Sequence, residues 1–144
     1  MVITFQLAEP QHSTRLLAMM KELQADDPWS VPFDDEGAAR ATDRLLGDPV
    51  LGRVWLIAAD GEIVGYIVLA FDYSLEYRGR GAWVDEFFVR RTHRGLGIGA
   101  QALEFFAGQA KELGATVIHL EVIAAIPPST STATWASKTT SVTS

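Results

Sequence analysis

One stretch of the chain, residues 82–103, constrains its fold more than any other. Residues 82–90 are rich in aromatic and β-branched side chains, which favours a buried strand. Residues 91–96 are basic and contain glycine. From about Gly97 the apolar side chains recur at helical spacing until Gly114 ends the pattern. The sequence therefore predicts a strand, a glycine-containing turn and a helix in direct succession.

A strand, turn and helix arranged in this way can bind an anion. The first N–H groups of a helix have no partner inside the helix, and the helix dipole adds positive potential at the same end. Glycines remove the Cβ atoms that would hold a phosphate away, and they allow the positive φ angles that turn successive N–H groups toward one point. Arg94 adds a fixed positive charge. We therefore expect a phosphate ligand, and a pyrophosphate rather than a lone anion.

Three classes of phosphate-binding loop compete for this stretch. A P-loop ends in Gly-Lys-Ser/Thr, and residues 95–100 contain no such run. A dinucleotide-binding fingerprint is formally present as Gly95-x-Gly97-x-x-Ala100, with Glu121 about 20 residues further on. Its position disfavours it, because a basic connector separates the strand from the glycines and antiparallel strands are expected earlier in the chain. This alternative predicts NAD binding and an all-parallel sheet.

The third class fits the residues best. Arg94-Gly95-Leu96-Gly97-Ile98-Gly99 matches the pattern Arg/Gln-x-x-Gly-x-Gly/Ala, and Phe87-Phe88-Val89 precedes it on the expected strand. The segment resembles the GNAT superfamily of acetyl-CoA-dependent N-acetyltransferases, over roughly residues 1 to 125. The resemblance implies an α/β (α+β) fold with a GNAT-like mixed sheet, in which an antiparallel meander is followed by strand, helix and strand.

The resemblance also implies the site residues. The pyrophosphate of acetyl-CoA would lie on the loop, and the backbone of Phe88 and Val89 would align the pantetheine arm. The acceptor amine must lose a proton before it attacks, and Asp85 or Glu86 would accept that proton. Neighbouring residues on a strand face opposite sides, so we expect only one of the two in the cleft. The implied cofactor-binding residues are Phe88, Val89, Arg94, Gly95, Leu96, Gly97, Ile98, Gly99 and Ala100.

The remaining elements follow from periodicity and turn signals. Asp60-Gly61 between two apolar runs predicts a β-hairpin. Residues 72–81 are expected to form a polar connector. The acidic stretch 26–37 either attracts a cationic amine or is a solvated loop with helix-capping residues. The expected strands are 2–7, 53–59, 62–71, 82–90 and 116–123, and the expected helices are one after Glu9-Pro10, one over 34–46 and one from Gly97.

The resemblance ends near residue 125. Residues 1–125 form an incomplete GNAT-like domain that lacks the usual last helix and two strands, and residues 126–144 form a Ser/Thr-rich tail outside the family pattern. No tyrosine follows Tyr77, so the tyrosine that usually protonates the departing thiolate has no match. We predict that the tail pairs with the open edge beside the fifth strand, in its own chain or in a partner's, which leaves a homodimer open.

We also hypothesise that the tail is a frameshift product. Ala133 to Lys138 reads Ala-Thr-Trp-Ala-Ser-Lys, and codons for this run can encode Tyr-Leu-Gly-Phe-Glu when read from the third base of the first codon. That shifted sequence closely resembles the end of the family's fourth helix and the strand after it. Sequencing of the coding DNA tests the hypothesis, since a gene without such a shifted frame would contradict it.

Composition narrows the function classes. The 144 residues carry a net charge of −6, which argues against a nucleic-acid partner. There is no cysteine, no signal-peptide pattern and no apolar run long enough for a membrane span, so we expect a cytoplasmic protein without a membrane partner. The three histidines show no metal-ligand spacing, and we expect no metal site.

We therefore interpret the chain as an N-acetyltransferase that uses acetyl-CoA and acts on a primary amine of a small molecule, polyamine-like or other, or of a peptide. The alternative is a non-catalytic GNAT remnant that binds CoA or dimerises. Turnover against a panel of amines separates the two.

Overall fold

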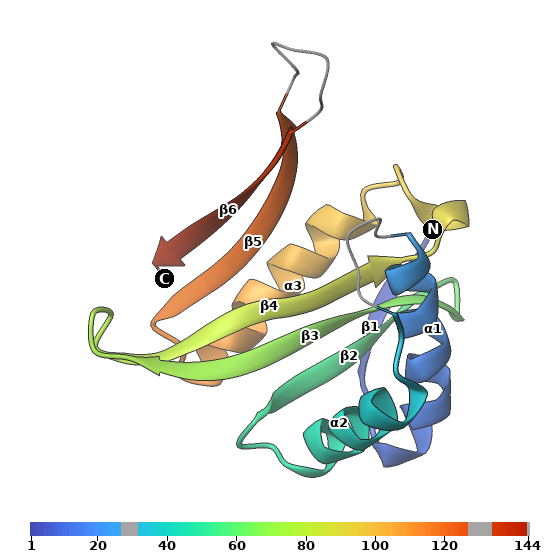
Figure 1. Ribbon diagram of the computed structural model, residues 1–144, viewed down its shortest axis with the longest axis horizontal. Helices are drawn as coiled ribbons and strands as arrows, with labels where there is room; N and C mark the ends of the chain where they lie inside the picture. Colours follow the sequence, from blue (N-terminus) through green and yellow to red (C-terminus); the bar gives the residue numbers. More distant parts are fainter. Residues whose placement is uncertain (27–31, 127–133, 144) are drawn as a thin grey trace.

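The computed structural model describes residues 1–26, 32–126 and 134–143, with side chains as far as Leu120 (Figure 1). Part of the predicted acidic loop, residues 27–31, lies outside the described residues, as does Ala133, the first residue of the run that supports the frameshift hypothesis. The elements in chain order are β1 (Ile3–Leu7), η1 (Pro10–His12), α1 (Ser13–Ala25), α2 (Asp35–Gly47), β2 (Gly52–Ala59), β3 (Glu62–Ser74), β4 (Gly79–Val89), η2 (Arg91–His93), α3 (Ile98–Glu112), β5 (Val117–Ile126) and β6 (Thr134–Thr143).

The strands form one mixed sheet in the order β1-β2-β3-β4-β5-β6. Every neighbouring pair is antiparallel except β4 and β5, which are parallel and joined through α3. This confirms the predicted meander followed by strand, helix and strand. It excludes the dinucleotide-binding alternative, which requires an all-parallel sheet.

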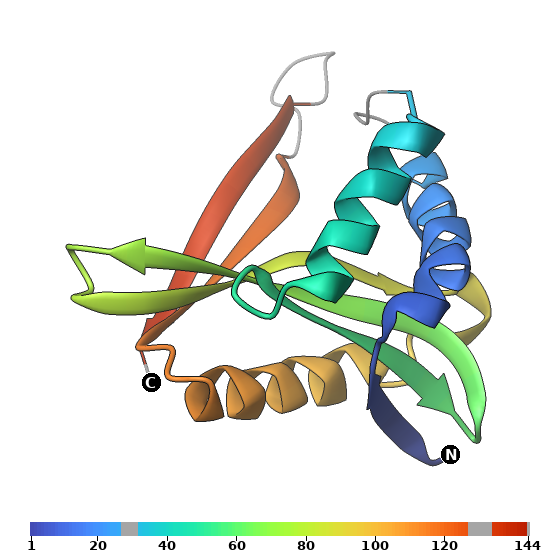
Figure 2. The same cartoon turned by 90° about the horizontal axis from the view of Figure 1, so that it is seen from below.

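Helices cover both faces of the sheet. Helix α3 lies on one face, and α1 and α2 stand on the other (Figure 2). Successive side chains of a strand point to opposite faces of the sheet, so the buried side chains form two clusters, one on each face. Ile67, Leu69 and Val84 pack toward Phe106 of α3, whereas Val68 and Phe88 belong to the cluster on the side of α1 and α2. Burial of these apolar side chains is what fixes each helix to its face.

The β2–β3 turn forms as predicted. Asp60 and Gly61 have φ angles of 48° and 83°, the pair of positive values that a two-residue hairpin turn requires. The expected connector over residues 72–81 is wrong at both ends. Asp72 pairs with Gly81 and Ser74 with Gly79, so β3 and β4 continue as a long hairpin beyond the rest of the sheet (Figure 1). Polar composition did not prevent pairing, because an antiparallel ladder needs only backbone groups.

The tail forms a strand. β6 pairs antiparallel with β5 over the whole length from Val117↔Thr143 to Ile126↔Thr134. This confirms the prediction that the tail pairs beside the fifth strand, and it does so within its own chain. Strand pairing uses backbone N–H and C=O groups, so a segment rich in serine and threonine can supply it. The frameshift hypothesis stays a prediction.

The parallel pair β4–β5 separates part-way along. Its register runs only from Gly81↔Val117 to Val84↔Leu120, although β4 continues to Val89 and β5 to Ile126. Beyond this point β5 turns away from β4 together with β6 (Figure 1). The described strands therefore leave the β5 side of β4 unpaired from Asp85 onward, directly before the glycine-containing turn.

Candidate active site

The turn before α3 has the geometry that its glycines predict. Gly95 and Gly97 have φ angles of 75° and 83°, a left-handed conformation that costs an L-residue about 1–2 kcal/mol. A Cβ atom on either glycine would meet no atom of the described residues within 4 Å, so these residues leave the space in front of the turn open. No side chain caps the helix at Gly97. The N–H groups of residues 95–100 form no hydrogen bond with any residue that the structure describes. These amides are free to bind an anion.

Arg94 holds the turn in place. Its Nε donates to the carbonyl oxygen of Val89 at 2.7 Å, and its Nη2 donates to Asp26 at 2.8 Å. The guanidinium also lies 5.7 Å from the ring centroid of Phe88. The N–H of Arg94 donates to the carbonyl of Arg91 at 3.3 Å. The residue predicted as a fixed charge for phosphate thus anchors the loop to β4 and to the end of α1.

Asp26 was not among the predicted site residues. It follows the last residue of α1 and accepts hydrogen bonds from both Arg94 and Arg91. The hydrogen bond from Arg94 is the largest cause that holds the pKa of Asp26 below its ordinary value, and the bond from Arg91 acts in the same direction. Asp26, Phe88 and Arg91 border a cavity of about 310 Å³ beside the turn. In the sequence, Asp26 was recognisable only as part of the acidic stretch, because its partners Arg91 and Arg94 lie 65 and 68 residues away.

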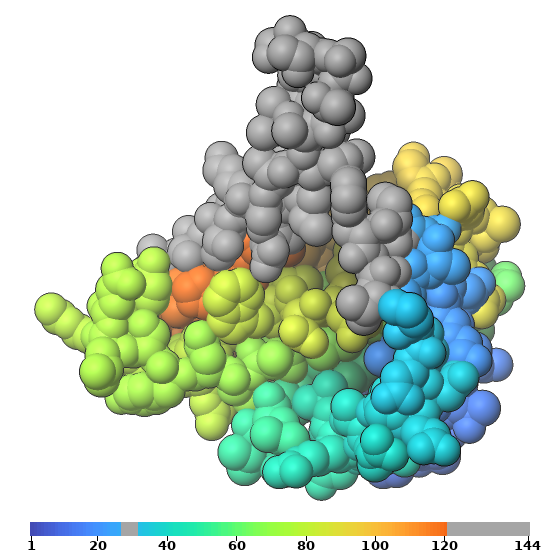
Figure 3. Space-filling model, in the orientation of Figure 1, coloured from blue at the N-terminus to red at the C-terminus, as the bar shows by residue number. Residues whose placement is uncertain are grey.

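Asp85 and Glu86 line one cavity, contrary to the expectation that they face opposite sides. Val68 pairs with Glu86 and Leu69 with Val84, so Asp85 is an extra residue in β4. Such a β-bulge interrupts the alternation of side chains and bends the strand. The bulge therefore brings both carboxyl groups to the face that carries α1 and α2. Figure 3 shows that this face is hollowed between these helices and the β3–β4 hairpin.

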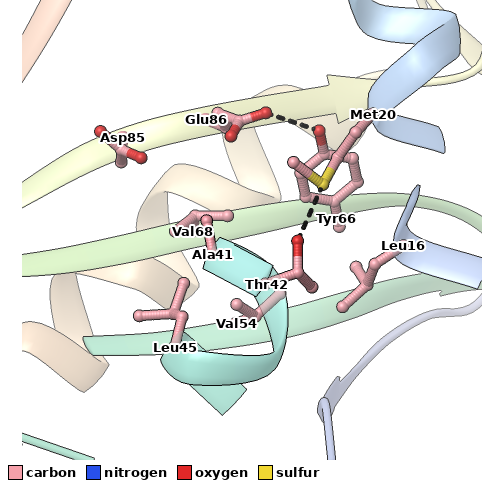
Figure 4. A pocket seen from close by; sticks show the side chains of 10 residues that line it. All are labelled: Leu16, Met20, Ala41, Thr42, Leu45, Val54, Tyr66, Val68, Asp85 and Glu86. Atoms are coloured by element: carbon pink, nitrogen blue, oxygen red, sulfur yellow. Dashed lines mark hydrogen bonds between the residues drawn. The ribbon is translucent and has the colours of Figure 1, made fainter. Parts of the chain in front are cut away.

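Glu86 is half-buried and held by a tyrosine (Figure 4). The hydroxyl of Tyr66 donates to Oε1 of Glu86 at 2.9 Å. Burial is the main cause that raises the pKa of Glu86 above its ordinary value, and the charge of Asp85 adds to the increase, whereas the bond from Tyr66 opposes it. Burial, followed by the charge of Glu86, raises the pKa of Tyr66. Tyr66 lies within an apolar run of β3, so nothing in the sequence pattern distinguished it.

Tyr73, Tyr77 and His119 do not line this cavity, whereas His93 ends η2 directly before Arg94. Tyr73 is 75% exposed on the β3–β4 hairpin. Tyr77 packs edge-on against His119, which is buried and stacks on Trp83 with ring centroids 4.5 Å apart. In the described part of the chain, no group of three or more metal-binding side chains is brought together. No described helix is both long and apolar enough to cross a membrane.

Comparison with known proteins assigns the family. The model of the Acetyltransferase (GNAT) family matches residues 16–131. The chain belongs to the GNAT acetyltransferase family. This GNAT chain is 28% identical over 109 residues to a streptothricin acetyltransferase from Streptomyces lavendulae, an alignment that covers 72% of this chain and 53% of the relative. The chain thus spans about half the length of that curated relative.

Solved structures share the GNAT fold. An integron cassette protein from the mobile metagenome of Cole Harbour Salt Marsh is 40% identical with a TM-score of 0.73, and the match covers 81% of this chain and 74% of that protein. A predicted acetyltransferase from Clostridium acetobutylicum, solved with acetyl-CoA, is 21% identical with a TM-score of 0.72 and coverage of 83% and 80%. At this identity the second likeness concerns the fold alone.

Proposed function

We propose that this chain transfers the acetyl group of acetyl-CoA to a primary amine of a small molecule or a peptide. The observation that carries the proposal is the row of amides at residues 95–100 that have no partner among the described residues and follow the end of β4 that β5 leaves unpaired. The amides and the α3 dipole suit a pyrophosphate. The pantetheine arm would lie along the edge of β4 that β5 leaves unpaired from Asp85 onward, beside Phe88 and Val89, and family membership supports acetyl-CoA as the acetyl donor.

In this proposal the two carboxyl groups act on the acceptor. The amine nitrogen attacks the thioester carbonyl carbon, the carbon–sulfur bond breaks, and the departing thiolate takes up a proton. Glu86 accepts the proton that the amine loses, because its raised pKa brings it closer to that of a base working near neutral pH. Tyr66 fixes the orientation of the accepting carboxylate. Asp85, exposed beside it, offers a second negative charge to the incoming ammonium group.

The test is an amine panel with acetyl-CoA, in which released thiol is measured alongside acetyl-CoA binding by calorimetry. We expect Glu86→Gln to lower kcat by roughly 10²–10⁴-fold, the usual contribution of a general base, and to leave acetyl-CoA affinity unchanged. Glu62→Gln, at an exposed position on the same sheet, is the control and should keep full activity. Tight acetyl-CoA binding without turnover of any amine would support the non-catalytic alternative. A cytoplasmic location and a homodimer stay predictions of the sequence.

A further inference from the structure

We infer that the preferred acceptor is a primary monoamine with a compact apolar substituent, rather than a polyamine. The inference deepens the proposed function, since it concerns the acceptor side of the same site. It starts from the cavity that contains Asp85 and Glu86, which lies between α1, α2 and the middle strands of the sheet (Figure 4). We call this cavity the acceptor chamber.

The acceptor chamber has one acidic wall and is otherwise uncharged. The two carboxyl groups come from β4, and no lysine, arginine or histidine is among the described residues that line it. Among the described lining residues, Thr42 and Tyr66 carry the neutral hydroxyls, and Thr42 donates to the carbonyl of Ala38 at 2.7 Å. The remaining walls are apolar side chains from both helices and from β2 and β3, namely Leu16, Met20, Ala41, Leu45, Val54 and Val68.

The volume of the chamber limits the size of the substituent. The chamber measures about 120 Å³. An engineered apolar cavity of about 150 Å³ in another protein holds one benzene molecule. By that comparison the chamber accepts a group of at most about six carbon atoms, such as a short alkyl chain or a small ring. A larger substituent would extend past the exposed Ala41 and the half-buried Leu45 of α2 into solvent.

The charge pattern selects against a second ammonium group. An ammonium at the acidic wall finds Asp85 and Glu86 as partners. A second ammonium on a short chain would instead face the half-buried Leu45 and the buried Val54, where it would lose part of its hydration and find no partner among the described lining residues. Burying an unpaired charge costs several kcal/mol, whereas a methyl group at the same position gains from its burial. Pentylamine and 1,4-diaminobutane differ by this one exchange and therefore form a matched pair.

The experiment measures the affinity of both amines for the protein without acetyl-CoA, by calorimetry or chemical-shift titration, and then kcat/KM with acetyl-CoA. We expect pentylamine to bind at least about tenfold more tightly than 1,4-diaminobutane, because the second ammonium loses hydration at the apolar wall, whereas the methyl group gains from burial there. Equal affinities, or tighter binding of the diamine, would overturn the inference. Since the binding measurement needs no transfer, it tests the inference even if no amine is acetylated, an outcome that would contradict the proposed function alone.

A pair of variants tests the chamber directly. Leu45→Asp places a carboxylate on the half-exposed apolar wall and should narrow or reverse the preference for pentylamine. Leu103→Asp makes the same exchange on α3, across the sheet, where Leu103 is 36% exposed, and should leave the preference unchanged. An equal effect of both variants, or no effect of Leu45→Asp, would show that the amines bind outside the chamber.

Discussion

The conformation of Gly97 provides a quantitative test of the phosphate-binding turn. Gly97 and Gly108 lie at the start and in the middle of the same helix, and a Cβ atom on either would meet nothing within 4 Å. The two positions differ in backbone conformation, since only Gly97 has a positive φ, of 83°. Alanine at both positions therefore compares the cost of that φ angle with the gain of a better helix former inside the helix.

The expected effects have opposite signs. Gly97→Ala should lower the free energy of unfolding by about 1–2 kcal/mol, the cost of a left-handed L-residue. Gly108→Ala should raise it by about 1 kcal/mol, because alanine is the better residue inside a helix. The two variants should thus differ by about 2–3 kcal/mol in urea denaturation monitored by circular dichroism.

Acetyl-CoA affinity completes the test. The free Gly97→Ala variant can relieve the strain of the positive φ angle if its turn moves. Binding of the pyrophosphate requires the original turn, so the variant must then take up that strain again. Calorimetry should therefore show an affinity loss of no more than about 5–30-fold, equivalent to the same 1–2 kcal/mol, and no loss for Gly108→Ala. A Gly97→Ala variant with the stability of Gly108→Ala and with wild-type affinity would refute the requirement for a left-handed residue in this turn.

Three further outcomes follow from the ionisable groups. Because burial raises the pKa of Glu86, the folded protein loses stability as pH rises from the ordinary glutamate value of 4.5 through the raised pKa of the folded state. In urea titrations, Glu86→Gln should therefore equal the wild type below 4.5 and be more stable than it at neutral pH. Tyr66→Phe removes a hydrogen bond that favours ionised Glu86, so the acid limb of the pH–rate profile should move to higher pH. An acid limb at the same pH would show that Tyr66 contributes through packing and not through this hydrogen bond. Because Arg94 lowers the pKa of Asp26, Asp26→Asn should lower the free energy of unfolding at neutral pH. This loss of stability relative to the wild type should vanish as pH falls well below 3.8. A loss that persists in acid would contradict an ionic contribution.

The pairing of the Ser/Thr-rich tail was predictable from the sequence only in part. Its strand pairing with β5 was predicted from an open sheet edge, and β6 confirms it. The pattern could not decide between its own chain and a partner's, because a ladder of backbone hydrogen bonds is the same in both cases. The position of the domain boundary near residue 125 and the frameshift stay predictions. A chain with the shifted frame restored from Ala133 should show higher turnover if the hypothesis is correct.

The local features of this protein follow from residues that are neighbours in the chain. These features are two glycines with positive φ, the helical periodicity after them and the Asp60-Gly61 turn. Each depends only on residues close together in the chain, so each could be predicted from the sequence. The tertiary structure decided the chemistry. The bulge that puts Asp85 beside Glu86 and the bond from Tyr66, 20 residues away, arise from the register between β3 and β4. That register results from packing of whole strands and helices, which no local pattern encodes.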